Sequence, residues 1–451
     1  MQPAPVPARS LRPVTTSRIP LDVRRVLAAA ESASPVDAVP EVARELALAL
    51  GAVRVSFLIS DASGRGLVRL AHTPLVGDDV GDPRAAGRRH EDEEAAAELP
   101  YDGGPAEQAM RTQTVQVLAE PAASGAARWR VLAPVTERGE AIGLLELYLP
   151  GEPSSEVVSE IGQVAHVLAF VVIANRGHTD LYEWGQRSQA YSLSAEIQQR
   201  LLPPSRTCEA AAFTLAGWLE PAATIGGDTY DYSLARDLLH LSLTDAMGHG
   251  VQASLTASMC LGSLRGARRR GLSLLEQAKA TNDAILQHPI SPSGSEFASG
   301  LVGRLDLRTG SLEIVNAGHI PPYLLRDGRL TTLDLAVDPP FGMFAESTYR
   351  ATQLSLTPGD RLVFVTDGML ERNPAGALLA ETIRDSDALH PRELVRHLAD
   401  NALEAAGHAL LDDATVLCLD WHGMHEEARD SVAGAEPARA SAPLGTNGTS
   451  D

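Results

Sequence analysis

The stretch LHLSLTDAMGHG, residues 239–250, contains a strand and a tight turn that meet at one aspartate. Leucines at every second position from 239 to 243 alternate with polar residues, which predicts a half-buried strand. Asp245 follows this strand and precedes the turn Gly248-His249-Gly250. The pattern therefore fixes a carboxylate at the end of a core strand.

Further aspartates lie beside expected strands in the same way: Asp228, Asp367, and the pair Asp412 and Asp413. Gathering several carboxylates near apolar walls is costly unless cations neutralise them. No His-x-x-x-His pair or cysteine cluster accompanies them, so the ligand set is oxygen-only, which favours Mg²⁺ or Mn²⁺ over zinc. Two such ions can lower the pKa of a water and direct it at phosphorus, which predicts hydrolysis of a phosphate monoester without a covalent intermediate.

The spacing of these aspartates also admits a simpler interpretation, because Asp-Gly turns such as Asp327-Gly328 arise by chance in an acidic chain. The order of the motifs favours the metal site. Five segments in sequence order resemble motifs of the SpoIIE/RsbU-like branch of the PPM (type-2C) serine/threonine protein phosphatases: IGGDTYD at 225–231, DAMGHG at 245–250, NAGHIPP at 316–322, TDG at 366–368 and DDAT at 412–415. The segment IQQRLLP at 197–203 resembles the lead-in helix of that branch.

This resemblance implies a fold and a set of metal ligands. The fold is an αββα sandwich, with two antiparallel sheets flanked by helices and the metals at one edge. Asp245 would bridge two Mn²⁺ or Mg²⁺ ions, and the backbone carbonyl of Ala246 would bind the second ion. Asp367 and Asp412 would complete the ligands of the first ion, while Asp228 would hold the second directly or through water.

Two histidines and an asparagine of these motifs each admit two roles. His249 could act as a general acid toward the leaving serine oxygen, or it could hydrogen-bond within its turn and orient Asp245, which is the favoured role. Asn316 and His319 could contact phosphate, although we expect them to brace the sheet instead.

Three further positions of the motifs qualify the ligand set. Asp413 is a weaker ligand candidate than Asp412, since the family usually uses the first carboxylate of this pair. Asp231 could orient Asp228 or a metal water. Ala246 stands where the wider family usually has glycine, and alanine would be strained there if the position required a positive φ.

Residues 21–176 predict a separate α+β domain. Two strands at 131–135 and 142–149, joined by a turn at 137–140, are followed by a helix at about 155–175. The strands and Gly139 between them resemble the closing hairpin of GAF sensor domains. All three cysteines lie downstream of this domain, which excludes a covalently attached bilin, and the ligand of the domain is unknown.

The remaining segments are assigned from composition and periodicity. Residues 1–20 predict a flexible leader, 177–204 a coupling helix, 205–422 the phosphatase domain, and 423–451 a disordered tail with few apolar residues. In the coupling helix, Leu193, Ile197 and Leu201 recur every four residues. This apolar stripe predicts either a passive spacer or, as we prefer, a helix that pairs in a homodimer and contacts the next domain.

Composition limits the partners and the cellular compartment that we expect for the chain. The formal charge of −20 argues against partners with an acidic surface, which excludes a nucleic-acid clamp or an anionic membrane. No apolar run reaches 18 residues, and the longest candidate, at 161–174, is interrupted by Gln163 and His166. Three widely spaced cysteines without a CxxC pair fit a reducing compartment. We therefore expect a cytoplasmic protein.

The sequence thus predicts a metal-dependent phosphoserine/phosphothreonine protein phosphatase that is regulated by a GAF-like domain. The resemblance implies a phosphorylated STAS-type anti-anti-sigma protein as the substrate. The alternatives are a signalling module that binds a partner without turnover, and a phosphatase of small molecules.

Overall fold

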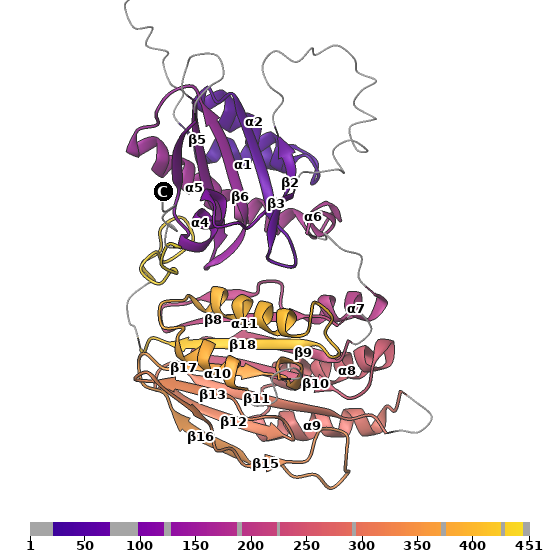
Figure 1. The fold of residues 1–451 in the computed structure, drawn as a ribbon. Helices are drawn as coiled ribbons and strands as arrows, with labels where there is room; N and C mark the ends of the chain where they lie inside the picture. Colours follow the sequence, from indigo (N-terminus) through magenta and orange to yellow (C-terminus); the bar gives the residue numbers. More distant parts are fainter. Residues whose placement is uncertain are drawn as a thin grey trace, which may run out of the picture.

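The computed structural model describes residues 21–72, 98–120, 128–186, 192–222, 226–290, 295–370, 376–424 and 429–444. The expected leader, residues 1–20, lies outside the described residues. The chain forms two domains, of which the N-terminal one lies above the C-terminal one in Figure 1. Both are mixed α and β, as the sequence predicts.

The N-terminal domain is built on one antiparallel sheet with the strand order β3-β2-β1-β6-β5-β4. The strands are β1 (Arg54–Ser60), β2 (Gly66–His72), β3 (Glu98–Pro100), β4 (Gln116–Glu120), β5 (Arg128–Glu137) and β6 (Glu140–Leu149). The predicted hairpin is that of β5 and β6. Its turn places Arg138 and Gly139 at positive φ, 44° and 77°, as the tight connection requires.

Helices cover both faces of this sheet (Figure 1). One face carries α1 (Val23–Ser32), α2 (Ala38–Leu50) and α5 (Ser155–Asn175), and the other carries α4 (Pro105–Thr112). Among the described helices α5 is the one long and apolar enough to cross a membrane. Residues such as Ile161, Leu168 and Val172 bury it in the core against the sheet, as expected for a helix of a domain core.

The C-terminal domain is a sandwich of two sheets (Figure 1). The first sheet has the order β15-β12-β11-β10-β9 with β16 beside β12, and the second has the order β14-β13-β17-β18-β8-β7. Leucine and aromatic side chains of both sheets form one shared core, for example Leu241 and Leu301 against Phe364 and Leu417. The pairs are antiparallel except for β12 with β15.

The strands of the first sheet are β9 (Asp228–Leu234), β10 (Leu238–Ala246), β11 (Ala298–Asp306), β12 (Ser311–Ala317), β15 (Val337–Asp338) and β16 (Ala351–Ser355). Those of the second are β7 (Thr207–Glu209), β8 (Phe213–Glu220), β13 (Tyr323–Arg326), β14 (Arg329–Thr332), β17 (Arg361–Val365) and β18 (Ala414–Trp421).

Helices α8 (Gly250–Arg269) and α9 (Leu274–Gln287) cover the first sheet, and α10 (Ala377–Arg384) and α11 (Pro391–Ala405) cover the second. The four layers are therefore αββα, which confirms the fold class expected from the sequence. The turn Asp327-Gly328 between β13 and β14 has positive φ at both residues, 50° and 71°, so it is the ordinary hairpin turn that the sequence suggests.

The connection between the domains differs from the single coupling helix expected at 177–204. It contains two short helices, α6 (Leu181–Gly185) and α7 (Leu193–Leu201). Ser192 is extended, with φ −67° and ψ 161°, and its side chain caps α7 by accepting from the amide of Ala195. A serine N-cap in extended conformation begins a new helix rather than continuing one, so the helical periodicity was correct locally and wrong across the break.

The expected disordered tail is wrong for residues 429–444. This segment lies between the two domains, with Ala435, Glu436 and Ser441 buried. Its order arises from hydrogen bonds and ion pairs with both domains, which composition does not reveal. Residues 425–428 and 445–451 lie outside the described residues.

The contact between the domains is mostly polar. Arg392 at the start of α11 donates to the carbonyl of Gly139 at 2.7 Å, and Arg396 donates to that of Gly64 at 3.1 Å. Arg65 binds Asp400 at 2.9 Å. A cavity of about 470 Å³ remains between the domains.

Candidate active site

The aspartates predicted from the sequence gather where strand ends of the two sheets meet. Asp245, near the end of β10, lies opposite Asp228 at the start of β9 in the first sheet. Asp367 follows β17, and Asp412 and Asp413 precede β18, which pairs with β17 in the second sheet. The fold therefore brings together five carboxylates that are up to 185 residues apart, the separation of Asp228 and Asp413.

Asp228 is buried and held by two threonines of the other sheet. Its Oδ2 accepts a hydrogen bond from Thr366 Oγ1 at 2.7 Å and one from Thr415 Oγ1 at 2.6 Å. Thr366 in turn accepts from the backbone amide of Thr415 at 3.0 Å. These bonds tie the two sheets together at the site and fix the orientation of the carboxylate.

Asp413 is buried and has both oxygens engaged by donors. Oδ1 accepts from the amide of Ala222 at 2.8 Å, and Oδ2 accepts from Gln198 Nε2 at 2.6 Å and the amide of Gly227 at 3.1 Å. Gln198 also donates to the carbonyl of Asp228 at 2.8 Å. Asp413 thus organises the loop before β9, and this role favours Asp412 over Asp413 as a ligand.

The other three carboxylates of the cluster differ in how far they are exposed to solvent. Asp245 and Asp412 are partly buried and Asp367 is exposed. Asp412 Oδ1 accepts from the amide of Asp413 at 2.8 Å. Asp245 and Asp367 are therefore more accessible than Asp228 and Asp413.

Burial and mutual repulsion disfavour full ionisation of the cluster. Burial, together with the charges of Asp367, Asp412 and Asp413, raises the pKa of Asp245 to about 7. Burial and the charges of Asp245 and Asp413 raise the pKa of Asp228 well above its ordinary value, although the two threonine bonds act in the opposite direction. A positive charge at this place would relieve that repulsion.

Close backbone contacts explain two glycines of the motifs. A Cβ on Gly227 would lie 2.4 Å from the carbonyl oxygen of Ala246, and one on Gly368 would lie 2.0 Å from that of Asp413. Neither distance is possible for a real side chain. Ala246 itself is in β10 and is not among the residues with positive φ, so alanine is unstrained at this position.

His249 does not brace the turn as we expected. It is the N-cap residue of α8, its side chain makes no capping hydrogen bond, and it is exposed. The imidazole is therefore accessible from the solvent side of the site.

Asn316 and His319 do brace the sheets. The two residues exchange hydrogen bonds of 2.9 and 2.7 Å through the Asn316 side chain, and His319 contacts Ser299 of β11 and the carbonyl of Val365 in β17. Burial lowers the pKa of His319 to about 4, so it is neutral. This pair supports the end of β17, two residues before Asp367.

Asp231 does not orient Asp228. It is buried and forms ion pairs with Arg265 at 2.8 Å and Arg268 at 3.0 Å, both on α8. It therefore attaches the helix to the sheet.

The residues of the cluster suit divalent metal ions. All the atoms that could bind a metal here are oxygens. Within the described ranges, no ion pair involves Asp228, Asp245 or Asp367. No three side chains of His, Cys, Asp or Glu in the described parts of the chain converge on one point, and like-charge repulsion opposes such convergence. Hard cations such as Mg²⁺ or Mn²⁺ match this donor set.

Sequence reasoning assigned no role to Gln198, Thr366 or Thr415, which position Asp228 and Asp413. All three were within the quoted motifs. Their polar side chains within otherwise buried segments were the available signal, because a buried polar group needs a partner.

Comparison with known proteins finds a family and several relatives that match the C-terminal domain. Residues 235–422, less than half of the chain, match the family described as Stage II sporulation protein E (SpoIIE). "Protein IcfG" of Synechocystis sp. is 26% identical over 207 residues, which are 40% of this chain and 32% of that protein. "Phosphoserine phosphatase RsbP" of Bacillus subtilis is 25% identical over 191 residues, 42% of this chain and 46% of that protein.

A third relative is matched over more of its length. "Phosphoserine phosphatase RsbU" of Bacillus subtilis is 23% identical over 270 residues, 57% of this chain and 79% of that protein. The matches to IcfG and RsbP span less than half of those proteins. A solved structure of the RsbU and RsbW domains of Rv1364c from Mycobacterium tuberculosis is 26% identical, covers 48% of this chain and 62% of its own, and has a TM-score of 0.42.

The hydrogen bonds of the cluster separate the roles of Asp413 and Asp367. Replacing Asp413 by alanine removes the acceptor of four buried donors, so we expect Asp413→Ala to lower the free energy of unfolding by about 2–4 kcal/mol. The matched change Asp367→Ala removes an exposed carboxylate and should leave stability unchanged or raise it slightly. Urea unfolding in EDTA measures both, and equal losses would contradict the different roles assigned here.

Proposed function

We propose that the chain is a metal-dependent phosphoserine/phosphothreonine protein phosphatase. The premise is that residues 235–422 are a domain of the SpoIIE family of PPM-type phosphatases. The observation that carries the proposal is the cluster of Asp228, Asp245, Asp367 and Asp412 at the meeting edges of the two sheets. A partner-binding module without turnover would not need these carboxylates, and the chain retains all of them.

The cluster divides between two Mn²⁺ or Mg²⁺ ions in this proposal. Asp245 would be a ligand of both ions, Asp367 and Asp412 would complete the ligands of the first, and Asp228 with the Ala246 carbonyl would hold the second. When bound, the ions would supply an activated water and neutralise charge on the phosphate. The chain itself holds Asp228 through Thr366 and Thr415, so this carboxylate is oriented before any ion binds.

His249 is the proposed donor of a proton to the leaving serine oxygen. It is exposed at the N-cap position of α8, within the same motif as Asp245. The free backbone amides of a helix start also favour a negatively charged group nearby. This position suits a phosphoserine side chain that enters from solvent.

The proposed substrate is a phosphorylated STAS-type anti-anti-sigma protein. Two of the relatives are named phosphoserine phosphatases, RsbP and RsbU, which supports a phosphoserine group as the substrate. The accessible side of the cluster, where Asp367 is exposed, suits a phosphorylated side chain on a folded partner. We place this reaction in the cytoplasm.

Regulation by the N-terminal domain, as a GAF-like sensor of an unknown ligand, completes the proposal. Helix α7 is the proposed coupling element, because Gln198 reaches from it to Asp413 and to the carbonyl of Asp228. Leu193 on the same helix is 66% exposed, which favours homodimerisation through this side. A shift of α7 would therefore move donors that hold the active site.

The first prediction concerns the metal. Activity on a phosphorylated protein should vanish in excess EDTA and return with Mn²⁺ or Mg²⁺, because the ligands are all oxygen. Assays after dialysis against chelator measure this dependence. Full activity without added metal would overturn the two-ion assignment.

The second prediction concerns Asp245. Asp245→Asn should lower kcat by about 100-fold or more, the loss expected for a group that fixes the charge of the transition state. Asp327→Asn is the matched control, because it changes an aspartate in a hairpin turn at φ 50°, a conformation that asparagine tolerates. Near-normal turnover of Asp245→Asn at saturating metal would refute the bridging role.

The third prediction concerns coupling through Gln198. Gln198→Leu removes the donor to Asp413, and we expect the Mn²⁺ concentration for half-maximal activity to rise about tenfold, as for other losses of groups that orient ligands. Gln199→Leu changes the neighbouring residue, which faces the cavity between the domains, and should leave metal dependence unchanged. Identical metal titrations of the two variants would argue against a role of α7 in the site.

A further inference from the structure

Residues 429–444, which we call the C-terminal strap, lie between the two domains and contact both. The segment has little regular structure beyond one bridge between Val432 and Ala435. Yet Ala435 is 1% exposed, Ser441 3% and Glu436 9%. A polar segment that is buried to this degree is held by specific partners.

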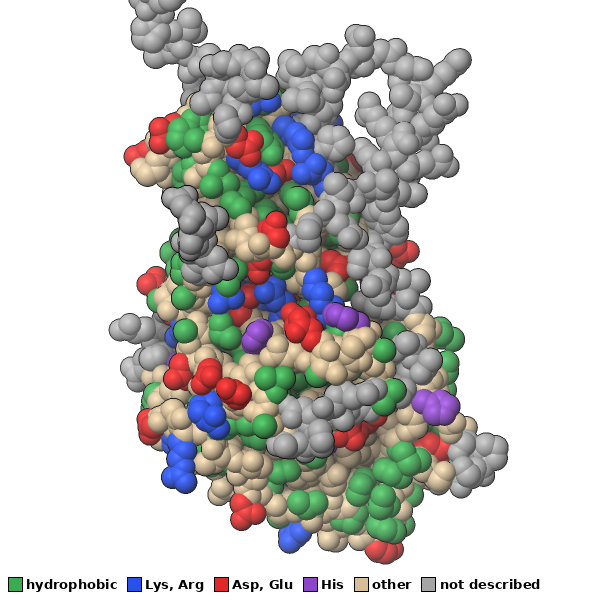
Figure 2. Space-filling model, in the orientation of Figure 1, with side chains coloured by type: hydrophobic (Ala, Val, Ile, Leu, Met, Phe, Trp, Pro, Cys, Tyr) green, Lys and Arg blue, Asp and Glu red, His purple; other side chains and the backbone are tan. Residues whose placement is uncertain are grey.

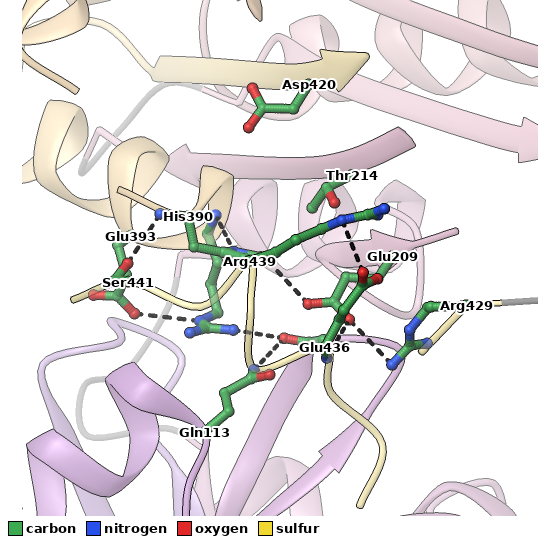
Figure 3. A network of polar contacts seen from close by, with 12 residues as sticks. Gln113, Glu209, Thr214, His390, Glu393, Asp420, Arg429, Glu436, Arg439 and Ser441 are labelled. Atoms are coloured by element: carbon green, nitrogen blue, oxygen red, sulfur yellow. Dashed lines mark hydrogen bonds and ion pairs between the residues drawn. The ribbon is translucent and has the colours of Figure 1, made fainter. Parts of the chain in front are cut away.

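Glu209 of β7 is the centre of these contacts (Figure 3). Its carboxylate is fully buried and accepts hydrogen bonds from His390 at 3.0 Å and from the backbone amide of Glu436 at 3.1 Å, and it forms an ion pair with Arg429 at 3.0 Å. Two of these three partners belong to the strap. Removing them would leave a buried oxygen of Glu209 without a partner, which is costly.

The protonation of this centre is fixed by its geometry. Nδ1 of His390 accepts from the amide of Arg392 at 3.1 Å, so Nε2 carries the proton that is donated to Glu209. Burial lowers the pKa of His390, although the hydrogen bond to Glu209 acts in the opposite direction. Burial would raise the pKa of Glu209, but the bond from His390 and the charge of Arg429 lower it overall. Arg429 of the strap is thus a source of positive charge for Glu209.

Further strap residues bind the C-terminal domain. Arg439 donates to the carbonyls of Ala210 at 3.0 Å and Ala211 at 3.2 Å, directly after β7. Ser441 accepts from the amide of His390 at 2.9 Å through its hydroxyl oxygen. These bonds satisfy backbone groups at the start of α11 and at the end of β7, where regular pairing stops.

The strap also binds the N-terminal domain. The carbonyl of Gly434 accepts from the amide of Gly139 in the β5–β6 turn at 3.1 Å. Arg111 of α4 donates to the carbonyl of Ala442 at 2.8 Å, and Gln108 exchanges two hydrogen bonds with the backbone of Leu444, at 3.4 and 3.2 Å. The same short segment therefore touches two separate elements of the upper domain.

The fit at Gly434 is too close for a side chain. Its φ is +89°, and an added Cβ would lie 2.1 Å from the carbonyl oxygen of Thr136 and 2.4 Å from Nδ1 of His166. Both atoms belong to the N-terminal domain and are themselves hydrogen-bonded to each other. The strap thus packs at this point as closely as a segment of the domain core.

We infer that the C-terminal strap is a built-in peptide ligand of the groove between the domains, and that it holds the N-terminal domain in a fixed position on the phosphatase-type domain. The groove is formed by the β5–β6 turn, α4 and α5 on one side and by β7 and the start of α11 on the other. Because the domains otherwise meet through exchangeable polar contacts, loss of the strap allows them to move relative to one another. This inference goes beyond the proposed function and does not depend on catalysis.

A cysteine pair tests whether the strap occupies this groove in the full-length protein. A Cβ on Gly162 of α5 would lie 3.7 Å from the Cβ of Ala433, within the range of disulfides. Gly162→Cys with Ala433→Cys, in a Cys208→Ser background, should therefore cross-link under mild oxidation. The control pair is Gly162→Cys with Val432→Cys, because Val432 is 61% exposed. Cross-linking no faster than this control would overturn the inference.

Hydrogen–deuterium exchange tests whether the strap holds the domains together. In the full chain, Gly434→Val should expel the strap, and exchange at 105–113 and at 137–140 should rise about tenfold while the β10 and β11 amides stay protected. Val432→Ser changes an exposed strap residue and should match wild type. If Gly434→Val loses protection throughout, Arg439→Gln provides the milder release of the same segment, with the same expectation.

The deciding measurement is the exchange rate of the elements that face the strap, residues 105–113 and 137–140. Faster exchange confined to them supports the inference, and a strap that exchanges freely while they remain as protected as in wild type refutes it. Neither readout uses phosphatase activity. An inactive enzyme with a docked strap would refute only the proposed function, and an active enzyme with a free strap only this inference.

Discussion

Repulsion among the carboxylates at the meeting edges of the two sheets is the constraint on which the C-terminal domain depends. The chain supplies two kinds of compensation. Hydroxyl, amide and backbone donors hold the inner carboxylates, Asp228 and Asp413, and the outer ones remain near solvent. Burial and the charges of Asp367, Asp412 and Asp413 still raise the pKa of Asp245 to about 7, so this compensation is incomplete.

The same constraint determines how the two sheets are joined. Thr366 and Thr415, from the second sheet, bind Asp228 of the first. His319 forms a second link, because it contacts Ser299 of β11 and the carbonyl of Val365 in β17. The backbone approaches so closely at Gly227 that a Cβ would contact Ala246. The apolar core between the sheets fixes their distance, and these polar links fix their alignment at the site.

The sequence predicted the parts of this structure that follow from local pattern and motif order. Alternating leucines and the following Asp245 indicated a strand end, and the ordered motifs indicated the αββα sandwich and the gathering of the aspartates. Gln198 was not assigned, because its partner Asp413 lies 215 residues away and periodicity reports only apolar burial. The break before Leu193 was missed because the N-cap Ser192 begins a new helix without changing the spacing of the apolar positions.

The strap was missed for a related reason, and that reason bears on how the domains communicate. Each apolar cluster of the described residues lies within one domain, whereas the domains meet through arginines bound to carbonyls and carboxylates. Composition cannot predict order that comes from such bonds, since water can replace each of them at little net cost.

An interface of this kind permits movement, so its geometry depends on the sum of many weak contacts. The strap adds contacts to both domains at once, while α7 joins the same region to Asp413. In the regulation that we propose, a displacement of the N-terminal domain would reach Asp413 through α7 when the strap contacts loosen or shift with it.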